Sequence, residues 1–193
     1  TGSYYRLFPI LGIQTETPFK IKNKLYDFTY RPHIQLVISP GISNSNKISN
    51  EDSSNNSYSL DNIASINRYS GTDRMDNSKR ISYGFDIYNN IIKLRLAQLY
   101  EFTDNSNYHI EQGNDDNLSD LLGSVGYFKE NEILYNFRYD LNDSYLKTQS
   151  INFKSKTKFG DIDVSYLDQN SKINNIITKD TESINYSFIS KKF

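Results

Sequence analysis

Cysteine is absent from the 193-residue sequence, which excludes disulfide frameworks and thiolate metal sites. An excess of positive charge is absent as well, because 22 lysines and arginines stand against 23 acidic residues and the net charge is −1. The chain therefore has no global basic field of the kind that attracts nucleic acid. No segment approaches the roughly 20 consecutive apolar residues that a membrane-spanning helix needs.

An export signal is also missing at the start of the sequence. The chain begins at Thr1, with no basic segment followed by an apolar one, as a signal peptide would have. An exported protein that has lost its signal would begin in this way, and so would an internal fragment of a longer chain. We favour the fragment and expect residues 1–193 to form one partial barrel domain that is truncated at both ends.

Aromatic residues are abundant although the chain as a whole is polar. The mean hydropathy is −0.68, yet the sequence has 16 tyrosines and 11 phenylalanines. Disordered chains of such polarity contain few aromatic residues. A barrel with lipid outside, water inside and aromatic girdles at its rims has this composition. A soluble β-sandwich also alternates apolar and polar residues, so composition alone favours neither fold.

Period-two alternation is the dominant pattern, and residues 26–38 show it best. Their even positions carry mainly aromatic and aliphatic residues: Tyr26, Phe28, Tyr30, Pro32, Ile34, Leu36 and Ile38. The odd positions are mostly polar, and successive side chains of a strand point to opposite faces. Strands of soluble proteins usually have about 5–6 residues, whereas a tilted strand needs roughly 9–11 to cross a membrane. This segment is long enough to cross.

The same alternation recurs along the chain and predicts about nine strands. The further segments are 81–87, 92–102, 133–141, 161–166 and 184–188, with weaker candidates at 5–13, 121–128 and 149–153. Short polar turns are expected near 20–24, 88–90, 129–132 and 158–160. Longer Asn- and Ser-rich loops are expected near 41–61, 103–119 and 168–181, with a briefer one at 142–144.

Followed strand by strand, every short turn falls on one side of the sheet and every longer loop on the other. Bacterial outer-membrane barrels sort their connections in this way, and a sandwich has no reason to do so. The pattern therefore predicts an all-β fold, an antiparallel transmembrane β-barrel segment that belongs to a larger barrel.

Motifs of enzymes and metal sites are not found. The two histidines, His33 and His109, lie in different predicted hairpins, and there is no G-x-S-x-G, Walker, H-E-x-x-H or EF-hand spacing. An outer-membrane phospholipase can assemble its site from separate strands, which spacing does not exclude. We interpret His33 as a polar lumen residue, His109 as a solvated loop residue, and the acidic runs 51–52 and 115–116 as solvated carboxylates. We expect no enzyme, cofactor or metal.

Two polar segments with possible local structure lie between the strands expected at 26–38 and 81–87. Residues 50–53 read N-E-D-S and residues 67–74 read N-R-Y-S-G-T-D-R, with two arginines flanking an aspartate beside a glycine suited to a tight turn. We predict a folded loop or strand cap on the long-loop side, turned at Gly71 and held by pairing of Asp73 with an arginine. The plainer alternative is a solvated loop. The residues singled out are Asn50, Glu51, Asp52, Ser53, Asn67, Arg68, Gly71, Asp73 and Arg74.

The order of these segments resembles the barrel region of the LptD family, particularly its alphaproteobacterial form. P-x-I-Q-L-V-x-x-P at residues 32–40 is followed by N-E-D-S, by N-R-[FY]-S-G-x-D-R and by Y-G at 83–84. Residues 97–102 are similar to the family's G-Q-x-Y-x-F strand, with Ala97 at the usual glycine. The motifs shared with the family run from about Pro9 to Phe102. Beyond Phe102 only the alternation of strands and turns is similar to the family.

The resemblance implies transport without covalent chemistry at the cell outer membrane. In the family, lipopolysaccharide arrives over a periplasmic Lpt bridge, its sugar passes through a polar lumen and its lipid leaves sideways into outer-membrane lipid. A plug lipoprotein, LptE, fills the barrel. The family's periplasmic domain, its gate strands and the cysteines that some members use to join domains are not found in this sequence.

Alternation places five polar side chains toward the lumen: Arg31, Gln35, Lys93, Arg95 and Arg138. There they would either contact lipopolysaccharide phosphates or simply form the hydrated polar lining of a water-filled lumen. Two other functions stay open, a generic porin-like or small complete barrel and a surface β-sandwich adhesin. A periplasmic domain encoded upstream would favour LptD over a small barrel, and detergent dependence would separate both barrels from the adhesin.

Overall fold

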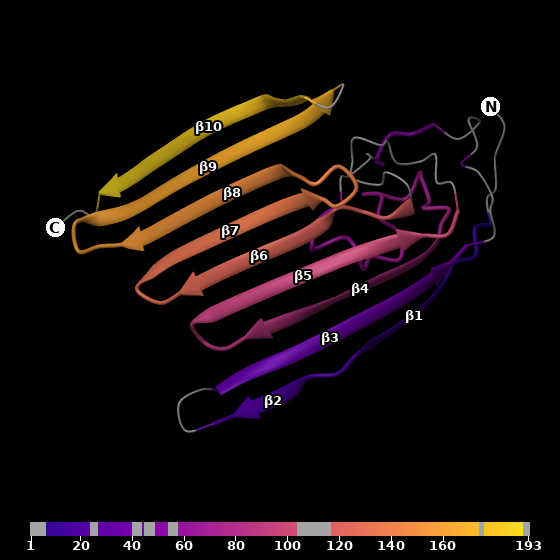
Figure 1. Cartoon of the computed structure of the whole chain (residues 1–193), viewed down its shortest axis with the longest axis horizontal. Helices are drawn as coiled ribbons and strands as arrows, with labels where there is room; N and C mark the ends of the chain where they lie inside the picture. The colour runs from indigo at the N-terminus through magenta and orange to yellow at the C-terminus, as the bar shows by residue number, and fades with distance from the viewer. Residues whose placement is uncertain are drawn as a thin grey trace. The chain divides into compact units, whose positions relative to one another are not determined.

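The structure is a computed structural model that describes residues 7–23, 27–39, 44, 49–53, 58–103, 117–173 and 176–190. Their regular elements are mostly long strands (Figure 1). The ten strands are β1 (Leu11–Glu16), β2 (Phe19–Lys22), β3 (Asp27–Ile38), β4 (Lys79–Tyr88), β5 (Ile92–Glu101), β6 (Leu121–Phe128), β7 (Asn131–Asp140), β8 (Tyr145–Lys156), β9 (Gly160–Ile173) and β10 (Ile176–Ser190). Within the described ranges no helix is long and apolar enough to cross a membrane.

The strands form one antiparallel sheet in the order β1-β3-β4-β5-β6-β7-β8-β9-β10, and β2 also pairs with β3. From β3 onward each strand lies beside the next one in sequence, so the sheet is a succession of hairpins. The order is an open path from β1 to β10 among the described strands. The predicted all-β antiparallel fold is confirmed. The β-sandwich alternative is wrong, because a sandwich needs two sheets.

A proline explains why there are ten strands where about nine are expected. Both β1 and β2 pair with β3, β1 opposite residues 33–38 and β2 opposite residues 27–30. Pro18 lies between them, and it has no backbone N–H to donate. Thr17 still donates to the carbonyl of Pro32, at 3.3 Å. The strand expected at 5–13 thus lies at Leu11–Glu16, and after Pro18 the short strand β2 occupies part of the turn expected at 20–24. Both strands are at the edge of the sheet, where proline is tolerated.

The chain divides into two compact units, each of which is described by itself. The first comprises residues 1–16, 33–84 and 97–120, and its core is a small set of fully covered apolar side chains. Val37 and Leu99 come from strands, whereas Tyr58 and Ile63 come from the segment between β3 and β4. That segment therefore folds back onto one face of its own strands.

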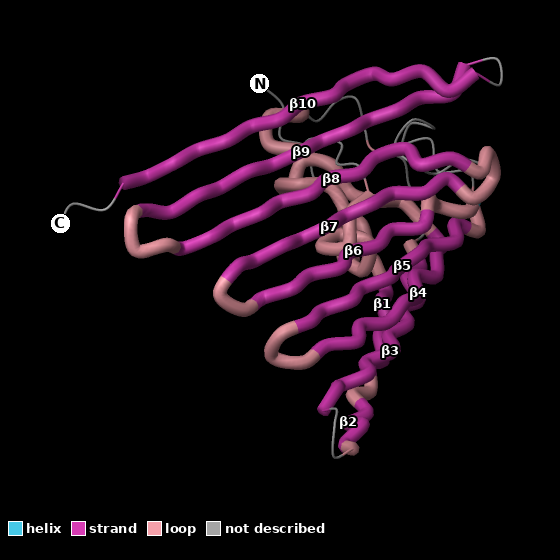
Figure 2. Tube along the Cα trace, turned by 60° about the vertical axis from the view of Figure 1, so that its left-hand side comes forward, coloured by secondary structure: helices cyan, strands magenta, loops and turns pink. Residues whose placement is uncertain are grey.

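The second unit comprises residues 17–32, 85–96 and 121–193. Its β6–β10 run as consecutive hairpins (Figures 1 and 2). Gly123 on β6 is the register partner of Phe137 on β7, and a Cβ at position 123 would collide with the Phe137 ring. The aromatic ring thus covers the glycine backbone, an arrangement that fixes the register of neighbouring strands.

Burial along the strands is inverted relative to a soluble protein. In β3, Gln35 is 4% exposed, whereas Leu36 beside it is 38% exposed. Soluble proteins bury aliphatic side chains and expose polar ones. The exposed apolar positions include Ile34, Leu36, Ile38, Tyr83, Val125, Tyr127, Ile133 and Ile151, and the buried polar ones include Gln35, Arg80, Ser82, Asp86, Glu101 and Ser124. A barrel wall with lipid outside and a polar interior has this arrangement.

The connections follow the predicted sorting except at the last hairpin. Short turns join β4 to β5, β6 to β7 and β8 to β9, whereas residues 39–78 and 102–120 form long connections at the opposite strand ends. The long loop expected at 168–181 is wrong, because β9 continues to Ile173 and β10 begins at Ile176.

Cross-strand polar pairs extend this last hairpin. The ammonium group of Lys179 on β10 lies 3.6 Å from the Asp168 carboxylate on β9, and it lies 2.9 Å from the carboxylate of Glu182 on its own strand. The Ser171 hydroxyl donates to Asp180 at 2.8 Å. Polar side chains of β9 and β10 therefore bond to each other across the hairpin. Read from the sequence alone, the same polar composition is typical of a loop.

Candidate functional site

The candidate site is the polar inner face, defined as the face of β3, β4 and β5 that carries Gln35, Arg80 and Glu101. These side chains are buried, and alternation puts every second residue of each strand on the same face. In the first unit the connection between β3 and β4 folds over this face. The site thus combines strand residues with residues of a long loop.

Four charged side chains meet at the centre of the first unit. Arg68 and Asp76 come from the long loop before β4. Arg80 lies at the start of β4, and Glu101 at the end of β5. The Arg68 guanidinium donates through Nε and Nη2 to Asp76, the latter bond measuring 3.0 Å, and its Nη2 lies 3.4 Å from Glu101 Oε2. Arg80 Nη1 lies 3.0 Å from Asp76 Oδ2. We call these four residues the buried ion cluster.

The buried ion cluster is fully shielded and electrically balanced. All four side chains are 0% exposed, and two arginines face two carboxylates. Further bonds tie the cluster to its surroundings: the Lys79 amide and the Ser78 hydroxyl donate to Glu101, at 3.0 Å and 2.7 Å, and Arg80 donates to the carbonyl of Ile66 at 3.0 Å. Removing one partner of a buried pair costs about 3–5 kcal/mol, so the cluster fastens the loop to the strands.

A tyrosine covers the cluster from the loop side. The Arg68 guanidinium carbon lies 4.8 Å from the centre of the Tyr58 ring, within the range of a cation–π interaction. Burial raises the pKa of Tyr58 to about 12. The phenol therefore stays neutral at physiological pH and adds no further charge beside Asp76 and Glu101.

The N-E-D-S segment joins the second motif through reciprocal carboxylate bonds. The Asp52 carboxylate accepts from the backbone amides of Asp73, at 2.9 Å, and Thr72, at 3.0 Å. In return the Asp73 carboxylate accepts from the amides of Glu51, at 2.7 Å, and Asp52, at 3.1 Å. The amides of Asp73 and Thr72 hold the pKa of the Asp52 carboxyl well below its ordinary value of 3.8, because they stabilise the charged form.

Gly71 allows this close approach. Its φ is 80°, in the left-handed region that side chains disfavour. A Cβ at this position would also collide with the backbone oxygen and the carboxylate of Asp52. Glycine is therefore required both by the turn and by its neighbour.

The remaining motif residues extend the same network toward the ion cluster. Asn50 and Ser53 bond to each other, and the Ser53 hydroxyl accepts from the amide of Arg74 at 3.0 Å. The Asn67 side chain donates to the carbonyl of Arg74 at 3.2 Å and accepts from the amide of Asp76 at 3.0 Å. The two motifs, separated in sequence, thus form one hydrogen-bonded loop structure.

The partners of the arginines differ from those in the predicted pairing. The sequence suggested that Asp73 pairs with an arginine, whereas the structure shows Asp73 accepting backbone amides of residues 51 and 52. Arg68 instead reaches Asp76 and Glu101. Of the nine motif residues, Arg68 alone belongs to the buried ion cluster.

Two of the predicted lumen-facing cations share one carboxylate in the second unit. Arg31 on β3 lies 2.5 Å from Asp86 on β4, and Arg95 on β5 lies 3.6 Å from the same side chain. Asp86 is almost fully buried between them, whereas both arginines remain partly exposed. This row of three side chains crosses three neighbouring strands and leaves one excess positive charge.

The other predicted lumen residues have separate environments. Gln35 donates to Gln14 at 3.1 Å and to the carbonyl of Ala64 at 2.6 Å, so it lies beneath the long loop. Lys93 is exposed on β5, and Arg138 is half-buried on β7 opposite Leu122. Lys93 precedes Arg95 by two residues on β5 and therefore lies on the same face of that strand.

Metal-binding geometry is not found in the part of the chain that the structure describes. No three His, Cys, Asp or Glu side chains gather there in a metal-binding arrangement. His33 is half-buried on β3, and His109 and the acidic run 115–116 lie outside the described residues. The inner face supplies charged and amide groups in compensated pairs, which suits polar contacts with a solute.

Sequence reasoning missed Asp76, Arg80 and Glu101, three members of the buried ion cluster. Arg80 and Glu101 do occupy the polar phase of their strands, so alternation was a usable signal. Asp76 follows the second motif by two residues. What sequence alone lacks is the strand register and the fold of the loop, which together bring Glu101 at the end of β5 beside Arg68 of the long loop.

Comparison with known proteins agrees with this architecture. The family model described as LptD, LPS transport system D, matches residues 1–190. The match includes the region beyond Phe102, where sequence motifs gave no anchor. No match to a curated protein was found.

Proposed function

The chain belongs to the LptD family, and from this premise we propose that it forms part of the wall of a barrel translocon. The translocon would insert lipopolysaccharide into the outer leaflet of the outer membrane. The family is one of lipopolysaccharide transport and not of enzymes. Residues 1–193 would supply a partial barrel domain within a larger barrel.

The observation that carries the proposal is the inverted burial of the strands. In β3 the apolar side chains of Ile34, Leu36 and Ile38 are exposed whereas Gln35 between them is buried, and Ile133 on β7 and Ile151 on β8 are exposed in the same way. In lipid, exposed apolar side chains cost nothing, and a closed ladder of strands satisfies the backbone. In water the same surface would be a large apolar patch that promotes aggregation.

The polar face suits the hydrated part of the cargo. The arginine row on β3, β4 and β5 places two partly exposed guanidinium groups around Asp86. Such groups bind phosphate and carboxylate through charge-assisted hydrogen bonds. The sugar portion of lipopolysaccharide would pass along this face, while its acyl chains would remain in contact with lipid.

The proposed partners follow from the family. They are lipopolysaccharide, outer-membrane lipid, an LptE-like plug lipoprotein and a periplasmic Lpt bridge that docks on the full-length protein. The loop fastened by the buried ion cluster would lie on the side away from the short turns, where extracellular loops of such barrels lie.

Site-specific photo-crosslinking in the full-length protein tests the proposal. A photoreactive residue at Ser150 lies on the inner face of β8 opposite Asn136, and one at Ile151, which is 42% exposed, lies on the outer face. We expect lipopolysaccharide adducts at position 150 that require continuing lipopolysaccharide synthesis. Adducts at position 151 should not depend on synthesis. Absence of any synthesis-dependent adduct on the inner face would contradict transport along it.

A further inference from the structure

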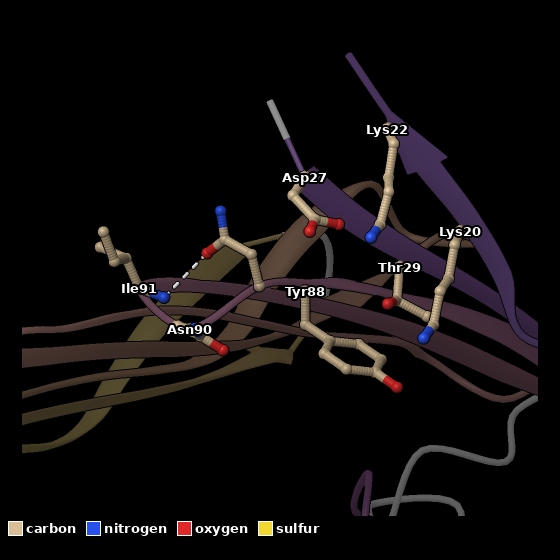
Figure 3. Close-up of a pocket in the computed structure, with 8 residues that line it drawn as sticks. Lys20, Lys22, Asp27, Thr29, Tyr88, Asn90 and Ile91 are labelled. Carbon is tan, nitrogen blue, oxygen red and sulfur yellow. Dashed lines mark hydrogen bonds between the residues drawn. The ribbon is translucent and has the colours of Figure 1, made fainter. Parts of the chain in front are cut away.

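A pocket of about 400 Å³ opens in the second unit beside the short turn between β4 and β5. Its lining comes from β2, from the start of β3 and from the turn itself: Lys20, Lys22, Asp27, Thr29, Tyr88, Asn89, Asn90 and Ile91. In Figure 3 the two lysine side chains extend from β2 toward the side chains of Asp27 and Thr29. The strand register agrees, because Lys20 is the partner of Thr29 and Lys22 that of Asp27.

The two lysines are available to a ligand. Among the described residues neither ammonium group takes part in a hydrogen bond or an ion pair, and both side chains are exposed. This differs from Arg31 and Arg95, which share Asp86. An ammonium group without a carboxylate partner is a point charge suited to phosphate.

The surroundings of the pocket are positive. Arg31 lies with its guanidinium carbon 5.8 Å from the ring centre of Tyr88, a lining residue. Lys20, Lys22, Arg31 and Arg95 lie on this part of the inner face together with the carboxylates Asp27 and Asp86, and Lys93 is on the same face of β5 as Arg95. This excess of cations over carboxylates favours an anion with more than one negative charge, such as a phosphate monoester.

The size and the remaining groups indicate more than a phosphate. Pockets of roughly 300–1,000 Å³ hold small organic ligands, so about 400 Å³ exceeds the need of a single ion. Thr29 offers a hydroxyl, Asn90 a carboxamide, and Tyr88 both a ring and a phenol. Hydroxyl, amide and aromatic groups together match a sugar ring, which has polar edges and an apolar face.

We propose that this pocket binds a phosphorylated sugar, with Lys20 and Lys22 on the phosphate and Thr29, Tyr88 and Asn90 on the sugar. The inference rests on the proposed function, in which the polar part of a phosphorylated glycolipid passes along this face. The pocket lies at the short-turn ends of the strands. It is therefore a contact on the periplasmic side of the proposed route.

Binding of glucose 1-phosphate to the purified full-length protein in detergent tests the site without any transport. Isothermal titration should give a Kd at least tenfold lower for glucose 1-phosphate than for either glucose or inorganic phosphate. The double variant Lys20→Gln/Lys22→Gln should weaken glucose 1-phosphate binding at least tenfold. Lys20→Arg/Lys22→Arg, which keeps both charges, should retain most of it.

The matched control is Lys158→Gln, which removes a lysine from another short turn, where its ammonium lies 4.9 Å from the Phe159 ring. Equal loss in the control and the double variant would overturn the site, since binding would then reflect overall charge. Equal affinity for glucose 1-phosphate and the anionic lipid phosphatidylglycerol in micelles would overturn the sugar assignment.

Heat-modifiable migration on a gel shows that each variant is folded. The titration contains no lipopolysaccharide, so its failure would leave the proposed transport untouched, and absence of inner-face crosslinks would leave the pocket standing.

Discussion

Opposite charges meet in both compact units, but in contrasting surroundings. In the first unit Arg68, Asp76, Arg80 and Glu101 are wholly withdrawn from solvent. Among the hairpins of the second unit, Lys154 and Asp163 form a pair at 3.4 Å with side chains 59% and 43% exposed. Exposed pairs contribute about 0–1 kcal/mol, whereas breaking a buried pair costs several times more. The same chemistry therefore fastens a loop at the buried ion cluster and contributes little at this exposed pair between β8 and β9.

The largest effect is expected for Asp76→Ala. This change deprives Arg68 and Arg80 of a shared carboxylate within a fully buried site, and should destabilise the full-length protein by about 3–5 kcal/mol. Urea unfolding in detergent, followed by loss of heat-modifiable migration, measures it. The comparison between the units fails if Asp76→Ala unfolds at the same urea concentration as the parent.

A smaller effect is expected for Gly71→Ala, which breaks the loop without touching an ion pair. The left-handed φ and the contact with Asp52 both oppose a Cβ, and strain of this kind costs about 1–3 kcal/mol. Limited proteolysis should show faster cleavage between residues 50 and 75. Glu51→Ala is the matched control, because the exposed Glu51 contributes its backbone amide to Asp73. Similar cleavage rates in both variants would show that the turn does not depend on glycine.

Asp163→Asn should change stability by no more than about 1 kcal/mol. The carboxylate lies on β9, opposite Lys154 on β8, and both side chains are in large part exposed. The same urea titration used for Asp76→Ala provides the measurement. A loss as large as that of Asp76→Ala would mean that the hairpins rely on their ion pairs as much as the loop does.

The smallest effect concerns acid pH and the Asp52 carboxyl. Its folded pKa is lowered by the amides of Asp73 and Thr72, so its contribution to stability is fully present above the ordinary value of 3.8. That contribution is lost as the pH falls through the lowered folded pKa. Hydrogen exchange of the peptide containing Thr72 and Asp73 should therefore stay protected at pH 5 and weaken only below about pH 4. Asp52→Asn should remove this acid dependence, and an onset near pH 6 would contradict the assignment.

The strand pattern could be predicted from the sequence because one lipid-facing side imposes strict alternation. Residues 26–38 were expected as a strand, and β3 covers 27–38, with Tyr26 outside the described residues. Polar residues 168–181 were misjudged, because hairpin partners such as Asp168 and Lys179 satisfy one another only across strands. The LptD motifs identified the loop residues. They did not identify Glu101, whose role depends on a register that sequence does not display.

The arrangement of the buried ion cluster also has a consequence for the order of folding. Asp76 is eight residues from Arg68, whereas Glu101 is 33 residues away and belongs to the far end of another strand. Closing the shorter segment costs less chain entropy, so the Arg68–Asp76 pair can form before the hairpin of β4 and β5 is complete. When the long loop reaches the assembling sheet, Arg68 is then already paired with Asp76. Glu101 completes the buried ion cluster when β5 pairs with β4.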